Sequence, residues 1–276
     1  MLQSKQEKCP LPIDLLISMT HQEQATVKPS LNPVIIIPTR LASTRLPSKA
    51  LANIGGKPMI LWVLERALQA NIGPVFVACA EQAVADIVKG AGGQAILTDP
   101  QHPSGSDRIY EALNLIDPKK SFDVVINLQG DLPTIEPDNF DSVLKPLSNK
   151  AVDIATLVAK IESKTDPSNP NIVKAIMGLS EGEKVSRVIY FSRTLAPSGR
   201  GPFFHHIGIY AYRRKALSRF VNLPTSVLER RERLEQLRAL EDGMRIDATL
   251  VDTIPIGVDT LEDLNQAKSI LEKKHV

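Results

Sequence analysis

The sequence has only two cysteines, Cys9 and Cys79, which lie far apart with no C-x-x-C pattern or Cys/His cluster. Neither a disulfide framework nor a structural zinc site is supported, so a reducing cytoplasm is the simplest location. Long apolar runs are also missing. Stretches such as Val34 to Ile37 have the length of a strand, whereas a bilayer span needs roughly 20 apolar residues. We therefore expect no membrane insertion.

An excess of charge of one sign is absent as well. The 276 residues include 33 basic and 31 acidic side chains, and the formal net charge is +2 at pH 7. This balance argues against a general nucleic-acid-binding protein, which needs a strongly basic footprint. Any phosphate is expected to be held by a few local residues. The remaining composition, 43% hydrophobic and 23% charged, is that of an ordinary globular chain.

The first 32 residues differ in pattern from the rest. Pro10, Pro12 and Pro29 interrupt a polar stretch that has one weak apolar patch at 13–17. A secretory signal would need a basic start and a longer apolar stretch. We interpret residues 1–32 as a flexible N-terminal tail, with Met19 as an alternative start of the protein.

From Pro33 onward, short β-branched runs alternate with helical patterns, which is typical of βαβ units. Strands are predicted at 34–37, 74–79, 94–97 and 123–127, and helices at 59–70, 82–89, 104–115 and 138–147. After Lys150, strand-like runs follow one another without long helices, at 153–160, 171–177, 184–191 and 205–212. A helix at 228–241, a strand at 245–251 and a helix at 260–273 complete the pattern. We expect an α/β protein with a mainly parallel, Rossmann-like sheet and an antiparallel portion.

The most informative segment, residues 38–49, follows the first predicted strand. It carries Arg40, Arg45 and Lys49 among small hydroxyl residues, and open α/β sheets bind ligands beyond the carboxyl ends of their strands. Arginine can fork onto phosphate oxygens and lysine supplies a point charge, so the segment suits a polyphosphate. It is neither a P-loop nor a dinucleotide fingerprint, because both glycine patterns are absent. A solvated surface loop is the alternative.

Two carboxylates are candidates for the same sheet edge. Asp131 follows the predicted strand at 123–127, and a carboxylate opposite a phosphate-binding loop is what a magnesium–nucleotide complex needs. A helix cap or a plain turn would also explain this aspartate. Asp259 lies far downstream, and either Asp259 or Thr260 fits the N-cap of the last helix.

Other candidate residues carry weaker signals. The helix that starts near Ser104 or Ser106 presents free N–H groups that favour acceptors or anions, although an ordinary cap explains the same pattern. Arg193 and His206 near predicted strand ends are candidate acid-binding groups, but a lone histidine is more often structural. The side chains of Glu229, Glu232 and Gln236 share one helix face, which a solvated face would also explain.

Seven motifs, in order from about residue 33 to the C-terminus, together resemble the 3-deoxy-manno-octulosonate cytidylyltransferases, or CMP-KDO synthetases. They are Ile37-Pro-Thr-Arg-Leu-Ala-Ser-Thr-Arg-Leu-Pro-Ser-Lys49, Ser104-Gly-Ser-Asp-Arg108, Asn127-Leu-Gln-Gly-Asp131, Tyr190-Phe-Ser-Arg193, His206-Ile-Gly-Ile-Tyr210, Leu234-Glu-Gln-Leu-Arg238 and Gly257-Val-Asp-Thr-Leu-Glu-Asp263. Seven motifs in register are far more specific than any single one.

The resemblance implies an enzyme that transfers CMP from CTP to the acid sugar 3-deoxy-D-manno-octulosonate (KDO), giving CMP-KDO and pyrophosphate for lipopolysaccharide biosynthesis. It also implies a fold of the nucleotide-diphospho-sugar transferase type and a homodimer. Residues 33–150 would form the nucleotide-binding part of a single domain, 151–244 the sugar-acid-binding and dimerisation part, and 245–276 a closing strand and helix. CTP and KDO would be its partners.

The resemblance also implies roles for individual residues. The triphosphate would be held by Arg40, Ser43, Arg45 and Lys49, and the rest of the nucleotide by Ser104, Ser106, Arg108 and Gln129. Asp131 and Asp259 would hold Mg²⁺ and would act in catalysis together with Lys49 and Arg40. The sugar acid would be bound by Arg193, His206, Glu229 and Gln236.

The chain departs from the family pattern at a few positions. Ser48 stands where glycine is usual, Ala50 where proline is usual, and Leu132 where glutamate often follows the aspartate. The stretch 196–201 is also shorter and less aromatic than its usual counterpart. A related nucleotidyltransferase for another acid sugar, or a non-catalytic sugar-nucleotide-binding regulator, are the alternative functions.

Overall fold

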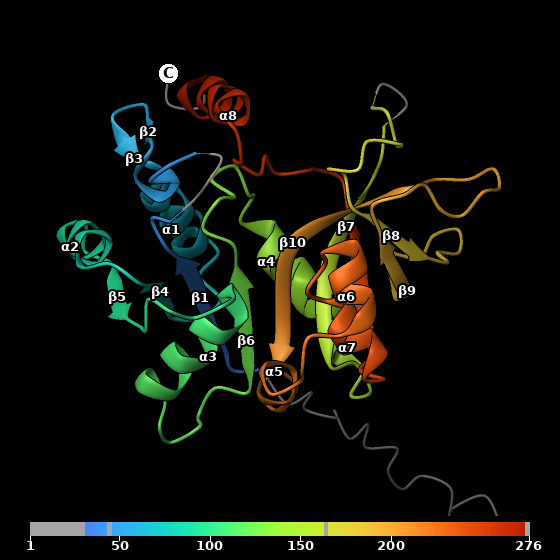
Figure 1. Ribbon diagram of the computed structural model, residues 1–276, viewed down its shortest axis with the longest axis horizontal. Helices are drawn as coiled ribbons and strands as arrows, with labels where there is room; N and C mark the ends of the chain where they lie inside the picture. The colour runs from blue at the N-terminus through green and yellow to red at the C-terminus, as the bar shows by residue number, and fades with distance from the viewer. Residues whose placement is uncertain (1–30, 43–45, 163–164, 274–276) are drawn as a thin grey trace, which may run out of the picture. The chain divides into compact units, whose positions relative to one another are not determined.

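The computed structural model describes residues 31–42, 46–162 and 165–273 (Figure 1). The predicted tail up to residue 30 and two predicted site residues, Ser43 and Arg45, lie outside the described residues. The compact unit that follows begins at Leu31. The backbone N–H of Asn32 donates to Asp123 Oδ1 (2.7 Å), and Asn32 Nδ2 donates to the carbonyl oxygen of Ser121 (3.0 Å).

Nine strands form one sheet in the order β5-β4-β1-β6-β10-β7-β11-β9-β8. Their bounds are β1 Pro33–Thr39, β4 Val75–Cys79, β5 Gln94–Leu97, β6 Val124–Leu128, β7 Ile154–Lys160, β8 Lys174–Met177, β9 Val185–Ser192, β10 Phe204–Arg213 and β11 Ile246–Val251. A separate short hairpin pairs β2 (Asn53–Ile54) with β3 (Lys57–Pro58).

The sheet is mixed. The strands β5, β4, β1 and β6 pair in parallel, as do β7 and β11. Strand β10 runs antiparallel between β6 and β7, and β8 and β9 also pair antiparallel. The predicted α/β class is confirmed, but an all-parallel arrangement holds only for β5, β4, β1 and β6. After Lys150 the strands β8, β9 and β10 follow one another without an intervening helix, and they pair antiparallel.

Helices cover both faces of the sheet. Their bounds are α1 Met59–Gln69, α2 Gln82–Gly90, α3 Gly105–Ile116, α4 Asp138–Leu144, α5 Arg214–Val221, α6 Val227–Glu232, α7 Leu237–Glu241 and α8 Leu261–Lys273, with 3-10 turns η2 (Lys49–Leu51) and η3 (Lys145–Ser148). Apolar side chains of α1, α2 and α4 pack into one core, and those of α3, α5 and α7 into another. Figure 1 shows α3, α6 and α7 in front of the sheet.

Strand β1 shows why its sequence is apolar at successive positions. Ile35 and Ile37 point into the first core, and Val34 and Ile36 point into the second. All four side chains have no exposed surface. A strand that is covered by helices on both faces needs apolar residues on both, so its pattern does not alternate. The polar residues begin where β1 ends, and this places the start of the segment 38–49 at the carboxyl edge of the sheet.

The C-terminal half differs from the prediction in two helices. The predicted helix 228–241 is two short helices, because α6 ends before Arg233, whose φ of 57° lies in the left-handed region. The intervening Leu234 is buried. Helix α5 was not predicted, since its eight residues follow β10 directly and are too few to show a clear period. Among the described residues, no helix is both long and apolar enough to cross a membrane.

A third apolar cluster holds the C-terminal segment against the first half of the chain. Leu264, Ala267 and Leu271 of α8 are buried together with Met59 and Trp62 of α1. The Trp62 Nε1–H donates to the carbonyl oxygen of Ile54 (2.9 Å). Val258, just before α8, belongs to the same cluster. The last helix therefore anchors the segment that leads into it beside the carboxyl edge of the sheet.

Candidate active site

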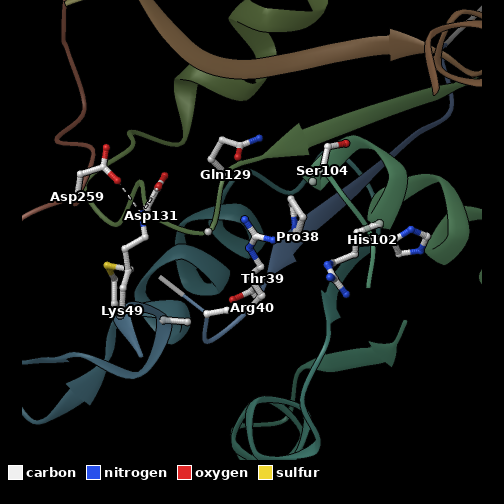
Figure 2. Close-up of a pocket in the computed structure, with 15 residues that line it drawn as sticks. Pro38, Thr39, Arg40, Lys49, His102, Ser104, Gln129, Asp131 and Asp259 are labelled. Carbon is white, nitrogen blue, oxygen red and sulfur yellow. Dashed lines mark hydrogen bonds and ion pairs between the residues drawn. The ribbon is translucent and has the colours of Figure 1, made fainter. Parts of the chain in front are cut away.

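A cavity of about 380 Å³ opens beyond the carboxyl ends of β1 and β6 (Figure 2). This volume lies within the range of roughly 300–1,000 Å³ that is usual for small-molecule sites. Seven of the residues singled out in the sequence line this cavity, namely Arg40, Lys49, Ser104, Arg108, Gln129, Asp131 and Asp259. The fold thus brings together three separate motifs and the segment before the last helix.

The central feature of the cavity is Lys49, which contacts two carboxylates. Its Nζ donates to Asp131 Oδ2 (2.7 Å) and to Asp259 Oδ1 (2.9 Å), as the dashed lines in Figure 2 show. Burial alone would lower the pKa of Lys49, but the two carboxylates outweigh burial and hold this pKa above its ordinary value. Lys49 is therefore a cation at neutral pH.

Backbone contacts bring Asp259 to Asp131. The N–H of Val258 donates to the carbonyl oxygen of Asp131 (2.9 Å), and the N–H of Ile256 donates to Thr134 Oγ1 (2.7 Å). Thr260 caps the last helix, because its Oγ1 accepts from the N–H of Asp263 (3.2 Å). This settles the choice between Asp259 and Thr260: the threonine caps, and the aspartate side chain lines the cavity.

Hydrogen bonds hold the basic segment, residues 38–49, at Leu41 and at Ser48. The N–H of Leu41 donates to Glu81 Oε1 (3.0 Å), and the N–H of Ser48 donates to the carbonyl oxygen of Leu41 (3.2 Å). Ser48 itself has a φ of 53° and a ψ of 31°, in the left-handed region. Only glycine adopts this conformation without strain, which explains why glycine is usual at this position in the family that the sequence resembles.

Gly130 lets two strand ends approach each other. A Cβ atom at this position would lie 3.0 Å from the carbonyl oxygen of Pro38. The neighbouring Gln129 is oriented by the strand that precedes it, since its Nε2 donates to Oδ1 of Asn127 on β6 (2.9 Å). The glycine therefore keeps the ends of β1 and β6 close enough to build one cavity wall.

The opposite wall is the start of α3. Ser104 is the N-cap of this helix, because its Oγ accepts from the N–H of Asp107 (3.1 Å), and it also lines the cavity. Arg108 is almost fully buried and donates from one nitrogen to Thr98 Oγ1 (2.6 Å) and the carbonyl oxygen of Asp99 (3.1 Å). Burial lowers the pKa of Arg108.

Ser106 is not among the residues that line the cavity. It is 2% exposed, and its Oγ donates to Glu235 Oε2 (3.0 Å). A residue two positions after the N-cap points to a different face of the helix, which the motif alone does not reveal. The nucleotide-binding role of Ser106 stays a prediction.

His102 lines the cavity but was not singled out as a site residue. Its Nε2 lies 2.5 Å from Glu111 Oε2 on α3, and the same carboxylate oxygen accepts from the N–H of Asp99 (2.9 Å). Glu111 thereby fixes the loop that precedes α3. In the sequence, the position of His102 was the signal that could have identified it, because it stands in a short loop between a predicted strand and a predicted helix.

The four residues assigned to the sugar acid do not line this cavity. Arg193 faces a second cavity of about 530 Å³, together with Arg231 and Arg233. Its guanidinium donates to three backbone carbonyl oxygens, those of Glu232 (2.8 Å), Pro170 (3.0 Å) and Arg233 (3.4 Å). Arg193 therefore ties β9 to the end of α6.

Glu229 has structural contacts, and Gln236 is buried. Glu229 accepts from two nitrogens of Arg238 (2.7 and 2.9 Å) and completes a capping box with Ser226. Burial raises the pKa of Glu229, but the hydrogen bonds from Arg238 and Ser226 outweigh burial and hold this pKa below its ordinary value. Gln236 lies immediately before α7. The contacts of Glu229 account for its position without a ligand, and the sugar-binding roles of both residues stay predictions.

His206 is buried between the rings of Phe191 and Tyr210. The Thr156 hydroxyl donates its single proton to the carbonyl oxygen of Ile209 (2.8 Å), so His206 Nε2 donates to that hydroxyl oxygen (3.0 Å). Burial, with a smaller effect of His205, lowers the pKa of His206 to about 3. The imidazole is therefore neutral at neutral pH.

The buried imidazole predicts a pH-dependent stability. Because the pKa of His206 falls from 6.5 to about 3 on folding, the unfolded chain takes up the proton first as the pH decreases. The contribution of His206 is complete above pH 6.5 and is lost as the pH falls toward 3. We expect His206→Gln to reduce the fall in unfolding free energy between pH 6.5 and 4.5 by roughly 2 kcal/mol. Urea unfolding of both proteins at several pH values measures this difference. An equal dependence of the unfolding free energy on pH in the two proteins would contradict the prediction.

The donor set suits a hard cation that also binds phosphate. Among the described residues, no group of three or more His, Cys, Asp or Glu side chains is placed to hold a metal ion. Asp131 and Asp259 nevertheless share one ammonium group, which shows that both carboxylates can face a single cation. Magnesium is usually bound by one or two carboxylates plus substrate phosphates and water, so the pair fits this ion.

Comparison with known proteins gives a consistent result. The family model described as a cytidylyltransferase matches residues 34–246. A protein of Paramagnetospirillum magneticum named 3-deoxy-manno-octulosonate cytidylyltransferase is 55% identical over 242 residues, which cover 88% of this chain and 98% of that protein. A protein of Rhodospirillum centenum with the same name is 56% identical over 243 residues, 88% of this chain and 95% of that protein.

A solved structure is also similar over most of the chain. It is that of a CMP:2-keto-3-deoxy-manno-octonic acid synthetase complexed with CTP, with a TM-score of 0.79 and 37% sequence identity. The match covers 88% of this chain and 99% of that one. The similarity therefore includes both the parallel strands and the C-terminal half.

Proposed function

Since the chain belongs to the family of 3-deoxy-manno-octulosonate cytidylyltransferases, we propose that it transfers CMP from CTP to KDO, giving CMP-KDO and pyrophosphate. One observation links this activity to the cavity. Lys49 contacts both Asp131 and Asp259 there, and Arg40 lines the same cavity. Lipopolysaccharide biosynthesis consumes such an activated sugar.

We propose that the reaction depends on magnesium held by Asp131 and Asp259. Both side chains are part-buried, which strengthens their electrostatic effect compared with a fully solvated pair. When bound, the ion would neutralise phosphate charge and lower the pKa of the attacking sugar hydroxyl. The two aspartates, which come from distant parts of the chain, would orient the bound groups.

The cationic side chains supply the remaining charge. Arg40 and Lys49 line the same cavity, and we propose that both contact the triphosphate and stabilise the charge that develops on leaving pyrophosphate. The wall with Gln129 and Ser104 would face the rest of the nucleotide. Catalysis in this scheme is positioning plus charge stabilisation, so no side chain need act as a dedicated base.

The sugar acid remains the less defined substrate. We propose that Arg193 contacts its carboxylate. Three of the five guanidinium N–H donors bond to carbonyl oxygens within the described part of the chain, which leaves two for a ligand. Arg231 and Arg233 line the same second cavity, so its arginines outnumber its one acidic residue, Glu232. These features support an acid-binding site that is separate from the nucleotide cavity in this structure.

Substitution of Arg193 distinguishes this role from a structural one. Arg193→Lys keeps the charge but loses the planar fork, so we expect the KM for KDO to rise about tenfold or more while the Kd for CTP changes little. Steady-state kinetics and calorimetric titration with CTP and magnesium measure the two quantities. Equal losses of KDO use and CTP affinity, or a collapse of the melting temperature, would assign Arg193 to the fold.

The proposed reaction is tested by pyrophosphate release. Purified protein is incubated with each common nucleoside triphosphate and with KDO or other acid sugars and sugar phosphates, and the nucleotide product is identified by mass spectrometry. CMP-KDO formed from CTP and KDO supports the proposal. Turnover with a different sugar would indicate a related nucleotidyltransferase, and no turnover with any pair would indicate a non-catalytic binding protein.

A homodimer and a cytoplasmic location stay predictions from the resemblance and the composition. One observation supports the dimer. Ile189 on β9 is 69% exposed, and it borders a third cavity of about 570 Å³ that is also lined by Val188, Leu240 and Met244. Exposed apolar groups of this kind favour association.

A further inference from the structure

The position of Lys49 has a consequence for the order in which ligands bind. We infer that the Lys49 ammonium competes with the divalent metal for Asp131 and Asp259, and that the nucleotide triphosphate makes the metal site available by drawing this ammonium away. The inference rests on the proposed metal and nucleotide sites. It concerns how the chain couples the two ligands, rather than which residues touch them.

The first step of the argument is the contact itself. Lys49 Nζ lies 2.7 Å from Asp131 Oδ2 and 2.9 Å from Asp259 Oδ1. The side chain of Lys49 is only 19% exposed, compared with 29% for Asp131 and 44% for Asp259. The Lys49 side chain is thus the least exposed of the three, and Figure 2 shows its nitrogen joined to both carboxylates by dashed lines.

The second step is that the two cations cannot share these oxygens. Magnesium requires oxygen ligands at roughly 2.0–2.1 Å and tolerates little distortion. Two positive charges at the same pair of oxygens would repel each other strongly in a partly buried site. A metal ion that binds the oxygens now contacted by the ammonium, Asp131 Oδ2 and Asp259 Oδ1, therefore requires the Lys49 ammonium to move.

The third step is that phosphate groups can replace the carboxylates as partners of the ammonium. Lysine is a compact point charge on a flexible four-carbon stem and is a common phosphate ligand. Lys49 and Arg40 line the same cavity, so a triphosphate drawn to the arginine comes within range of the lysine. The phosphates offer the ammonium new partners and offer the metal new ligands at the same time.

Removal of the Lys49 charge should change the affinity for metal alone in a defined direction. Metal alone should bind the protein weakly, because it must displace an ammonium that is already paired. Loss of the Lys49 charge should therefore strengthen the binding of metal alone, although the same change weakens the binding of nucleotide. A residue that served only as a phosphate ligand would weaken CTP binding and leave the affinity for metal alone unchanged.

The test uses Mn²⁺ as a paramagnetic probe in place of magnesium. Its Kd is measured by water-proton relaxation on the full chain without nucleotide. We expect Lys49→Met to bind Mn²⁺ about tenfold more tightly than the wild-type protein, since two partly buried ion pairs no longer compete with the metal. With saturating CTP present, this advantage should disappear. Lys49→Gln serves as a second variant if the methionine variant is unstable in thermal unfolding.

Two control variants distinguish direct competition by the Lys49 ammonium from a general effect of positive charge in the cavity. Arg40→Met removes a positive charge from the same cavity but from a side chain with no described contact to either carboxylate, and it should change the Kd for Mn²⁺ alone by less than about threefold. Adding Asp131→Asn to Lys49→Met should abolish the gain. An equal gain in Arg40→Met, or no gain in either Lys49 variant, would overturn the inference.

The outcomes also distinguish this inference from the proposed function. If the wild-type protein forms CMP-KDO but neither Lys49 variant binds Mn²⁺ more tightly, only the competition is wrong. If the gain in Mn²⁺ affinity persists after Asp131→Asn, the metal lies elsewhere and both the metal assignment and the inference fail. The Mn²⁺ measurement needs no turnover, so it stands apart from the activity of the enzyme.

Discussion

Replacement of Asp131 or Asp259 with asparagine is expected to reduce turnover on the order of a thousandfold or more, while the protein still folds. Each substitution removes one negative charge from the pair that would hold the metal, and asparagine keeps almost the same shape. The backbone contact between Val258 and Asp131 does not involve either side chain, so the segment should stay in place. Turnover is measured as CMP-KDO formation at saturating CTP and magnesium.

The matched control is Asp252→Asn. Asp252 follows β11 and its side chain is 90% exposed, with only a long contact of 3.7 Å to Lys184. This variant removes the same charge from the surface and should retain full activity. Thermal unfolding of all three variants checks the fold. Near-normal turnover in the Asp131 and Asp259 variants would show that these carboxylates do not hold an essential metal.

Gly73→Ala is expected to lower the free energy of unfolding by roughly 2–4 kcal/mol. Gly73 lies just before β4, and a Cβ atom there would lie 2.3 Å from the carbonyl oxygen of Pro33. That oxygen belongs to the backbone of β1, which pairs with strands on both sides and cannot shift easily. The adjoining hydrogen bond from the Ile35 N–H to the Pro74 carbonyl (2.9 Å) would also be strained.

Gly90→Ala provides the comparison for this substitution. Gly90 is the last residue of α2, and a Cβ atom there would have no neighbour within 4 Å. Alanine in a helix costs less backbone entropy than glycine, so this variant should be unchanged or stabilised by up to about 1 kcal/mol. Urea unfolding measures both proteins. Equal stability of the two variants would mean that the connection between α1 and β4 relaxes freely.

Much of the fold could be predicted because the strands and helices of the first half have strong patterns. The apolar run of β1 and the helical period of α1 identify both elements without knowledge of the contacts. The order and direction of the strands after Lys150 depend on pairing between distant segments, which local patterns do not encode. The break at Arg233 also depends on tertiary packing, because neighbouring residues all have good helix propensity.

The site was predictable where residues follow strands directly. Arg40 and Asp131 stand just beyond β1 and β6, and neighbouring parallel strands end at the same edge. The meeting of Asp131 with Asp259 rested on the family resemblance, since spacing along the chain cannot show it. The face of α3 on which Ser106 lies and the distance of Arg193 from the cavity depend on how helices and antiparallel strands pack, and only the structure shows them.

The hydrogen bond between Val258 and Asp131 has a consequence for how the protein is made. The basic segment, Asp131 and the strands β1, β4, β5 and β6 all emerge from the ribosome well before Asp259, whose position depends on α8 packing against α1. A nascent or prematurely terminated chain without that helix therefore presents Arg40, Lys49 and one carboxylate, but not the pair. Under the proposed metal assignment, we expect activity only after the last helix has been synthesised and has docked.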